Sequence, residues 1–226
     1  MSIEQLNEKY GIEGQLRFVE GRGGLAMIEI DNGQAQATIS TYAGQVLSFK
    51  PQGAAEDLLF VSKNAFFAQG KAIKGGIPVC WPWFGPDPEG RGRPAHGFVR
   101  NRPWQVIATQ ALPDGTTAVK LGVAGNADTR AIWPQTFNLF LQVTVGKTLS
   151  LELVTRNAGD VPFSITQGFH TYFKVGDIGR VQVHGLDDCS FIDKTAQGAV
   201  ETQVGPVTIG GEVDRIYQGV NRDLII

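Results

Sequence analysis

The sequence has few cysteines and histidines, and this scarcity argues against several kinds of site. Its 226 residues include two cysteines, Cys80 and Cys189, and three histidines. No histidine lies close to a cysteine, so the ligand spacing of a zinc site is missing. Because no export signal is evident, we expect both thiols to be free, and Cys80 to be a small buried residue. We therefore expect neither a metal ion nor a disulfide.

Long apolar runs and an excess of basic residues are also absent. No run of about 18 apolar residues occurs, which argues against a membrane span. The polar, acidic N-terminus lacks the apolar core of a signal peptide. The net charge is −2, whereas proteins that bind nucleic acid or acidic membranes usually carry a basic field. We expect a cytoplasmic protein that binds neither, and a monomer, because nothing in the sequence signals an oligomer.

Helical periodicity is scarce, and short β runs dominate the chain. We expect one helix over residues 2–10, with Ser2 as its cap, and a short helical turn between residues 126 and 134. Asn32-Gly33 between two apolar runs predicts a hairpin. Several runs are apolar on both faces, which favours a large sandwich over a small barrel. We predict an all-β fold, a large antiparallel β-sandwich that forms a single domain over residues 1–226. The expected strands and hairpins lie at 16–20, 25–30, 34–41, 45–49, 57–61, 104–125, 137–157, 161–175, 181–186, 191–194, 204–217 and 222–226.

One stretch, residues 74–100, has little periodicity and is dense in Pro, Gly and aromatic residues. Its composition predicts a loop of fixed shape, where binding groups often lie. Lys74 and Arg100 with nearby arginines suit a phosphate, and Trp83 and Phe84 suit the face of a sugar. A solvated charged surface is the plainer alternative. We expect the backbone N–H groups of Gly75 and Gly76 to be accessible, and the acidic residues Asp87 and Glu89 to face solvent.

The histidines are the main candidates for proton transfer. Along an extended segment, His170 shares one face with Gly168 and Tyr172, and Gly168 leaves room for a ligand to approach. Such a histidine can donate a proton, although a purely structural hydrogen bond explains it equally well. His96 lies at the exit of the loop and has an exposed, idle position as its alternative. We expect His184 to be structural or solvated. If residues 212–217 form a strand, Asp214 and Glu212 share a face, with a solvated edge as the alternative.

Four motifs in order resemble a known family. They are KGGIPVCWPWFG, HGFVR, FHTYFKV and GEVDRIY, and together they resemble the hexose-6-phosphate mutarotases of the aldose 1-epimerase superfamily. The resemblance runs from about Leu25 to Tyr217. It implies a supersandwich of the galactose-mutarotase type. It also implies interconversion of the α and β anomers of a hexose 6-phosphate, without a cofactor.

The resemblance also implies roles for individual residues. His170 resembles the general acid, and His96 the second histidine, which holds the ring and anomeric oxygens. Arg100 and Lys74 resemble the phosphate contacts, although the family usually has arginine at the position of Lys74. Asp214 resembles the aspartate that holds sugar hydroxyls.

The chain departs from the family at its C-terminal end. The family continues through further strands to a late glutamate, the base that takes the anomeric proton, and no residue here matches it. We therefore expect the C-terminal strands to be missing. A non-catalytic module that binds sugar phosphates is the alternative function. A lyase or hydrolase is a weaker one, because glycosidases need two carboxylates beside the bond.

Overall fold

The computed structural model describes all residues, 1–226, and divides into two compact units, residues 1–174 and residues 175–226. The expectation of a single domain over residues 1–226 stays a prediction. No helix in the chain combines the length and the apolar character that crossing a membrane requires.

The first unit begins with the predicted helix, α1 (Ile3–Tyr10). Ser2 is its N-cap and forms a capping box with Gln5, so the sequence-based prediction is confirmed. Asn7 fastens the helix to the first strand. Its side chain donates to the Phe18 carbonyl at 2.8 Å and accepts the Phe18 N–H at 2.7 Å.

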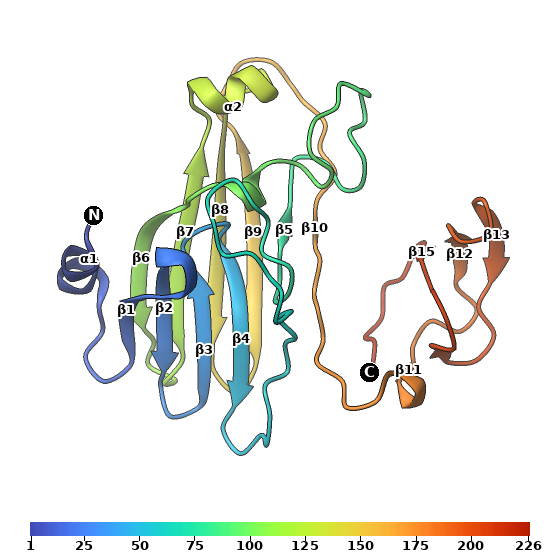
Figure 1. The fold of residues 1–226 in the computed structure, drawn as a ribbon, viewed down its shortest axis with the longest axis horizontal. Coiled ribbons are helices and arrows are strands. Elements are labelled where there is room, and N and C mark those ends of the chain that lie inside the picture. The colour runs from blue at the N-terminus through green and yellow to red at the C-terminus, as the bar shows by residue number, and fades with distance from the viewer. The chain divides into compact units, whose positions relative to one another are not determined.

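Two antiparallel sheets of four strands make up most of the first unit (Figure 1). The first contains β1 (Leu16–Glu20), β2 (Ala26–Asp31), β3 (Ala35–Ser40) and β4 (Gln45–Pro51). The second contains β6 (Gln105–Ala111), β7 (Thr117–Ala124), β8 (Phe137–Val145) and β9 (Leu149–Asn157). Within each sheet, neighbouring strands follow one another in the chain. The predicted hairpins, including the one that turns at Asn32, are therefore confirmed.

Side chains from both sheets join one hydrophobic core. In β8 every second residue is buried and the residues between are partly exposed. This alternation corrects the expectation of strands apolar on both faces. Phe140, one of the outward residues, instead lies under the Lys120 ammonium, 4.9 Å from its ring centroid. The predicted all-β sandwich is confirmed.

Short elements connect and flank the two sheets. They are the 3₁₀ turns η1 (Arg22–Gly24) and η2 (Val99–Asn101), the helix α2 (Ala127–Ile132), and the two-residue strands β5 (Val79–Cys80) and β10 (Gly168–Phe169). The predictions of regular strands at 57–61 and 161–175 were wrong. The first segment makes only isolated bridges, and the second contains only β10.

The second unit contains short strands only. After η3 (Ile178–Arg180), β11 (Gln182–Val183) pairs with β14 (Val207–Thr208). A three-stranded sheet has the order β13 (Ala199–Thr202), β12 (Ser190–Asp193), β15 (Arg215–Tyr217). Arg215 pairs with Asp193 at 3.3 Å and donates to the Gln203 side chain. The predicted strand at 222–226 is reduced to one bridge between Ile225 and His184.

Candidate functional site

The backbone around His170 is held by a short ladder. Gly168 and Phe169 pair with Cys80 and Val79. Beyond this pair, the N–H of His170 donates to the Pro78 carbonyl at 3.0 Å. Extended backbone alternates its side chains, and the His170 and Tyr172 rings accordingly stack with centroids 5.0 Å apart. The prediction that these two residues share a face is confirmed.

His96 is held next to β5, the buried strand that also pairs with β10. The next residue, Gly97, forms a parallel bridge with Trp81, directly after β5. His96 itself has φ of +63° and forms two hydrogen bonds with Gly85. Its N–H donates to the Gly85 carbonyl at 2.7 Å, and its Nδ1 accepts the Gly85 N–H at 3.1 Å. Because Nδ1 is an acceptor here, the proton of the neutral ring lies on Nε2.

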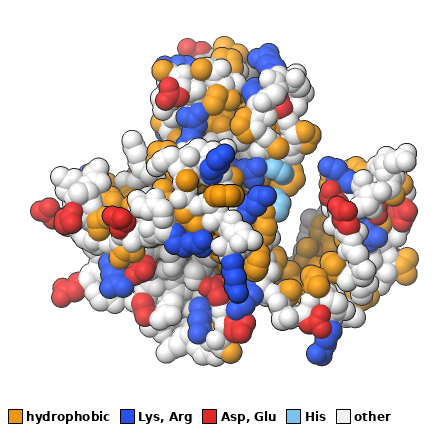
Figure 2. All heavy atoms as spheres, viewed as in Figure 1, with side chains coloured by type: hydrophobic (Ala, Val, Ile, Leu, Met, Phe, Trp, Pro, Cys, Tyr) orange, Lys and Arg blue, Asp and Glu red, His pale blue; other side chains and the backbone are white.

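The two histidines meet although 74 positions separate them in the chain. Their ring centroids are 5.8 Å apart and the rings are nearly perpendicular, at 88°. Both residues are half-buried. Figure 2 shows histidine atoms at the surface, on the same face as a group of Lys and Arg side chains. The loop and the later strand therefore form one histidine pair.

Phe84 extends this pair into an aromatic row. Its ring lies 4.9 Å from the His96 ring, and its side chain is exposed. A Cβ at Gly168 would lie 3.2 Å from the Phe84 ring. The expectation of open space above Gly168 is therefore corrected, because Phe84 occupies that space. Phe84 remains accessible for the predicted contact with a sugar.

Trp83, the other predicted sugar contact, is buried. It is 3% exposed, and the Arg93 guanidinium lies 4.3 Å from its ring centroid. Its Nε1 donates to the Pro94 carbonyl at 3.0 Å. This burial argues against sugar stacking and favours a packing role.

The predicted phosphate contacts differ in their surroundings. Lys74 is exposed. The next two residues, Gly75 and Gly76, are buried, and the Gly76 N–H donates to the Phe60 carbonyl at 2.8 Å. The expectation of accessible N–H groups at this turn is thus wrong for Gly76. Arg100 is half-buried: one Nη donates to Ala95, while its buried Nε has no partner. Binding of one phosphate by both Lys74 and Arg100 stays a prediction.

Asp214 lies in the second unit. Its side chain is exposed, and its carbonyl accepts the Lys194 N–H at 2.8 Å. The residue precedes β15 and is not part of it, so the expected strand face shared with Glu212 does not exist. A role for Asp214 toward sugar hydroxyls stays a prediction. His184, in the same unit, is exposed as expected.

Asp87 is the residue that sequence reasoning misjudged most. It was expected to face solvent, but its side chain is 6% exposed and pairs with Arg93. The Arg93 guanidinium holds the pKa of this carboxyl well below its usual range. Glu89 is exposed as expected. The clue was present in the spacing, because an Asp that begins a Pro- and Gly-rich turn often accepts backbone N–H groups ahead of it.

The remaining chemistry-bearing groups do not form a second site. Cys80 and Cys189 are both free and Cys80 is buried, as expected, and Cys189 is buried too. Burial raises the pKa of the Cys80 thiol, and the Arg100 charge offsets this in part. No group of three His, Cys, Asp or Glu side chains could hold a metal ion. A hollow of about 640 Å³ lies on the outward face of β1–β4, but it is lined by the solvated Arg17–Glu29 ion pair and contains no histidine.

Solved structures define the class of the fold. The chain matches a crystal structure from Salmonella typhimurium, described as a "putative mutarotase", with a TM-score of 0.84 and 35% identity. The match covers 92% of this chain and 68% of that one. A galactose mutarotase-like protein from Clostridium acetobutylicum, at 15% identity and a TM-score of 0.64, shares the fold. The fold is therefore of the galactose-mutarotase type.

The sequence itself gives the family. Residues 26–226 match the model of the aldose 1-epimerase family, and the chain belongs to that family. A protein of Escherichia coli named "Putative glucose-6-phosphate 1-epimerase" is 40% identical over 195 residues. That match covers 85% of this chain but 63% of the relative, so the chain spans less than two thirds of the relative's length.

Proposed function

We propose that this protein interconverts the α and β anomers of a hexose 6-phosphate by opening and reclosing the sugar ring. The histidine pair carries the proposal, because it places two proton-bearing rings 5.8 Å apart on an accessible face. The substrate class rests on Arg100 and Lys74, which supply cationic groups, and on the name of the Escherichia coli relative.

The proposed reaction needs one proton transfer at each of two oxygens of the sugar, the ring oxygen and the anomeric oxygen. His170 delivers a proton to the ring oxygen as the C1–O5 bond breaks, and the anomeric hydroxyl loses its proton as the aldehyde forms. The aldehyde rotates about C1–C2, and the oxygen at C5 then attacks its other face. His96 donates through Nε2–H to an oxygen on which charge develops. The anomeric proton passes to water, and both proton transfers run in reverse when the ring recloses.

Anomer exchange tests the proposal directly. Pure α-glucose 6-phosphate is dissolved with the 226-residue chain, and its approach to equilibrium is followed by polarimetry or NMR. We expect a rate above that of the buffer, and the loss of that increment in His170→Ala. The matched control is His184→Asn, since His184 is exposed and lies in the other unit.

Three outcomes separate the alternatives. A wild-type rate equal to that of the buffer refutes catalysis by this chain. Binding of glucose 6-phosphate, but not glucose, would then support a sugar-phosphate binding module. If the wild type is active and His170→Ala exchanges the anomers at the same rate, His170 is not the acid.

A further inference from the structure

The loop between Gly85 and His96 is wrapped around one buried carboxylate. The side chain of Asp87 accepts three backbone N–H groups of that loop, from Glu89 at 3.1 Å, Arg91 at 2.8 Å and Arg93 at 3.1 Å. A carboxylate that is 6% exposed is costly unless all its lone pairs are used, and here they are. The loop therefore has one defined conformation around Asp87.

Arg93 connects this carboxylate to the core of the first unit. Its Nε donates to Asp87 Oδ1 at 2.9 Å, and its side chain is 8% exposed. The guanidinium also lies over the Trp83 ring and reaches the carbonyl of Ile132 at the end of α2, at 3.4 Å. The loop and α2 lie at the same end of the unit in Figure 1. The pair thus fixes the loop against the Trp83 ring and the end of α2.

The ends of this loop are the two residues that bond to each other, Gly85 and His96. The Gly85 N–H on Nδ1 orients the imidazole and keeps its proton on Nε2. We infer that Asp87 and Arg93 are positioning residues for His96 in the proposed reaction, acting through the Gly85–His96 bonds. The expected effect on kcat rests on the proposed function, whereas the expected effect on the His96 ring does not.

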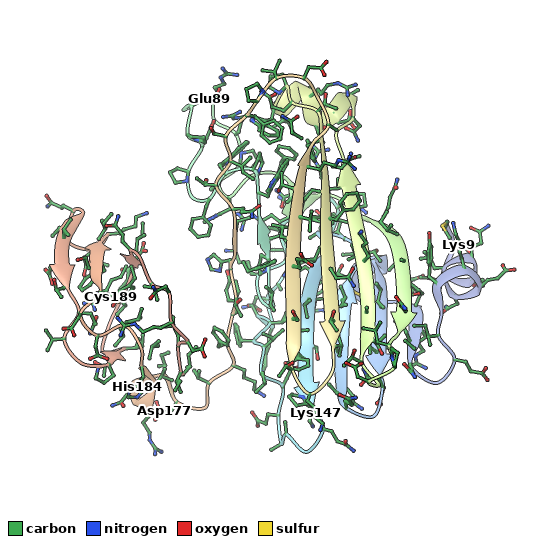
Figure 3. All side chains as sticks on the ribbon, turned by 180° about the vertical axis from the view of Figure 1, so that it is seen from behind. Lys9, Glu89, Lys147, Asp177, His184 and Cys189 are labelled. Carbon is green, nitrogen blue, oxygen red and sulfur yellow. The ribbon has the colours of Figure 1, made fainter.

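Two variants and one control test the inference in the full 226-residue chain. Asp87→Asn replaces one acceptor oxygen by an NH₂ group, and Arg93→Gln removes the guanidinium. Glu89→Gln is the control. It neutralises the exposed carboxylate of Glu89, labelled in Figure 3, which also contacts the Arg93 guanidinium at 3.4 Å, and it leaves the Asp87–Arg93 pair in place. The first readout is the tautomer of His96, from its ring ¹⁵N and ¹³C shifts at about pH 8, where histidine is neutral. The second is kcat and KM for α-glucose 6-phosphate.

We expect both variants to lose the dominant Nε2–H tautomer of His96 and to lower kcat about tenfold to a hundredfold. KM should change less than kcat, because Lys74 lies outside the loop and only Arg100, which donates to the Ala95 carbonyl at 3.0 Å, contacts it. Glu89→Gln should match the wild type in both readouts. Such a split between kcat and KM, together with the tautomer change, is not expected from a loss of stability alone.

Opposite results overturn the inference in separable ways. If the His96 shifts in Asp87→Asn and Arg93→Gln equal those of the wild type, the positioning role is wrong. If the shifts change but kcat does not, in a wild type that is active, the role has no bearing on catalysis. If the wild type itself is inactive, the proposed function fails, and the tautomer readout alone decides the inference. If Asp87→Asn does not fold, Arg93→Gln and Arg93→Lys decide it.

Discussion

Gly97→Ala should be among the most damaging single-methyl additions in the first unit. Gly97 has φ of +74°, a left-handed conformation that costs an alanine about 1–2 kcal/mol. Its Cβ would also lie 1.8 Å from the carbonyl oxygen of Trp81, where ordinary contact begins at 3.4 Å. Trp81 cannot yield, because it is fully buried and packs against Phe98 and Phe137.

The clash adds to the conformational cost. To relieve it, the chain must break the bridge between Gly97 and Trp81, including the Phe98 N–H bond to the Trp81 carbonyl at 3.2 Å. Leaving the buried Phe98 N–H and Trp81 carbonyl without this hydrogen bond costs about 1–3 kcal/mol. We therefore expect Gly97→Ala to lower the free energy of unfolding by about 3 kcal/mol or more. At about 2–4 °C per kcal/mol for a protein of this size, Tm should fall by roughly 6–12 °C.

Gly90→Ala is the matched control for this prediction. Gly90 lies in the same loop with φ of +64°, but nothing lies within 4 Å of its added Cβ. It should therefore show only the conformational cost, about 1–2 kcal/mol. Unfolding is followed by tryptophan fluorescence, because all four tryptophans are buried in the first unit. If the two variants unfold within about 0.5 kcal/mol of each other, the reasoning from the clash is wrong.

Two further predictions concern charged groups. Arg100→Ala should weaken binding of glucose 6-phosphate about ten- to hundredfold, since a charge-assisted hydrogen bond contributes about 1.5–3 kcal/mol. Calorimetry checks this, and an equal loss for unphosphorylated glucose would contradict the phosphate role. Relative to the wild type, Asp87→Asn should be destabilised most above about pH 4, because the folded-state pKa of Asp87 is lowered. The carboxylate contributes fully above the unfolded value of about 3.9, and this contribution is lost as pH falls below that value toward the folded pKa. Denaturant midpoints from pH 7 to pH 3 test this. A gap between wild type and variant that does not narrow with falling pH would exclude it.

Local patterns in the sequence predicted most of the regular structure. Ser2 as a cap, the turn at Asn32 and the hairpin turn after Ala111 all depend on residues a few positions apart. The alternation around His170 likewise predicted that His170 and Tyr172 share a face. These features could be read because neighbouring residues decide them.

Features decided by distant partners could not be read in the same way. Asp87 looks like a solvated acid in a charged loop, but it is covered by Arg93, whose guanidinium lies on the buried Trp83 ring. The segment 161–175 looks like a strand, but two of the carbonyls that accept its N–H groups, at 78 and 82, belong to prolines. Because proline has no N–H to donate in return, only Gly168–Phe169 forms a regular pair. Burial and pairing of this kind depend on tertiary contacts, which no local spacing encodes.

The two candidate histidines have a common support in β5 and the residue after it. On one side Gly97 bonds to Trp81, and on the other Gly168 pairs with Cys80, so both histidines are one or two residues from the same buried segment. A displacement of Trp81, as in Gly97→Ala, should therefore change the ring shifts of His96 and His170 together. Loss of the Asp87–Arg93 pair should change the His96 shifts most, since that pair contacts the loop and not β10, and should affect His170 only through the contact between the two rings. The two variants therefore distinguish the role of Trp81, which supports both histidines, from the role of Asp87 and Arg93, which orient His96.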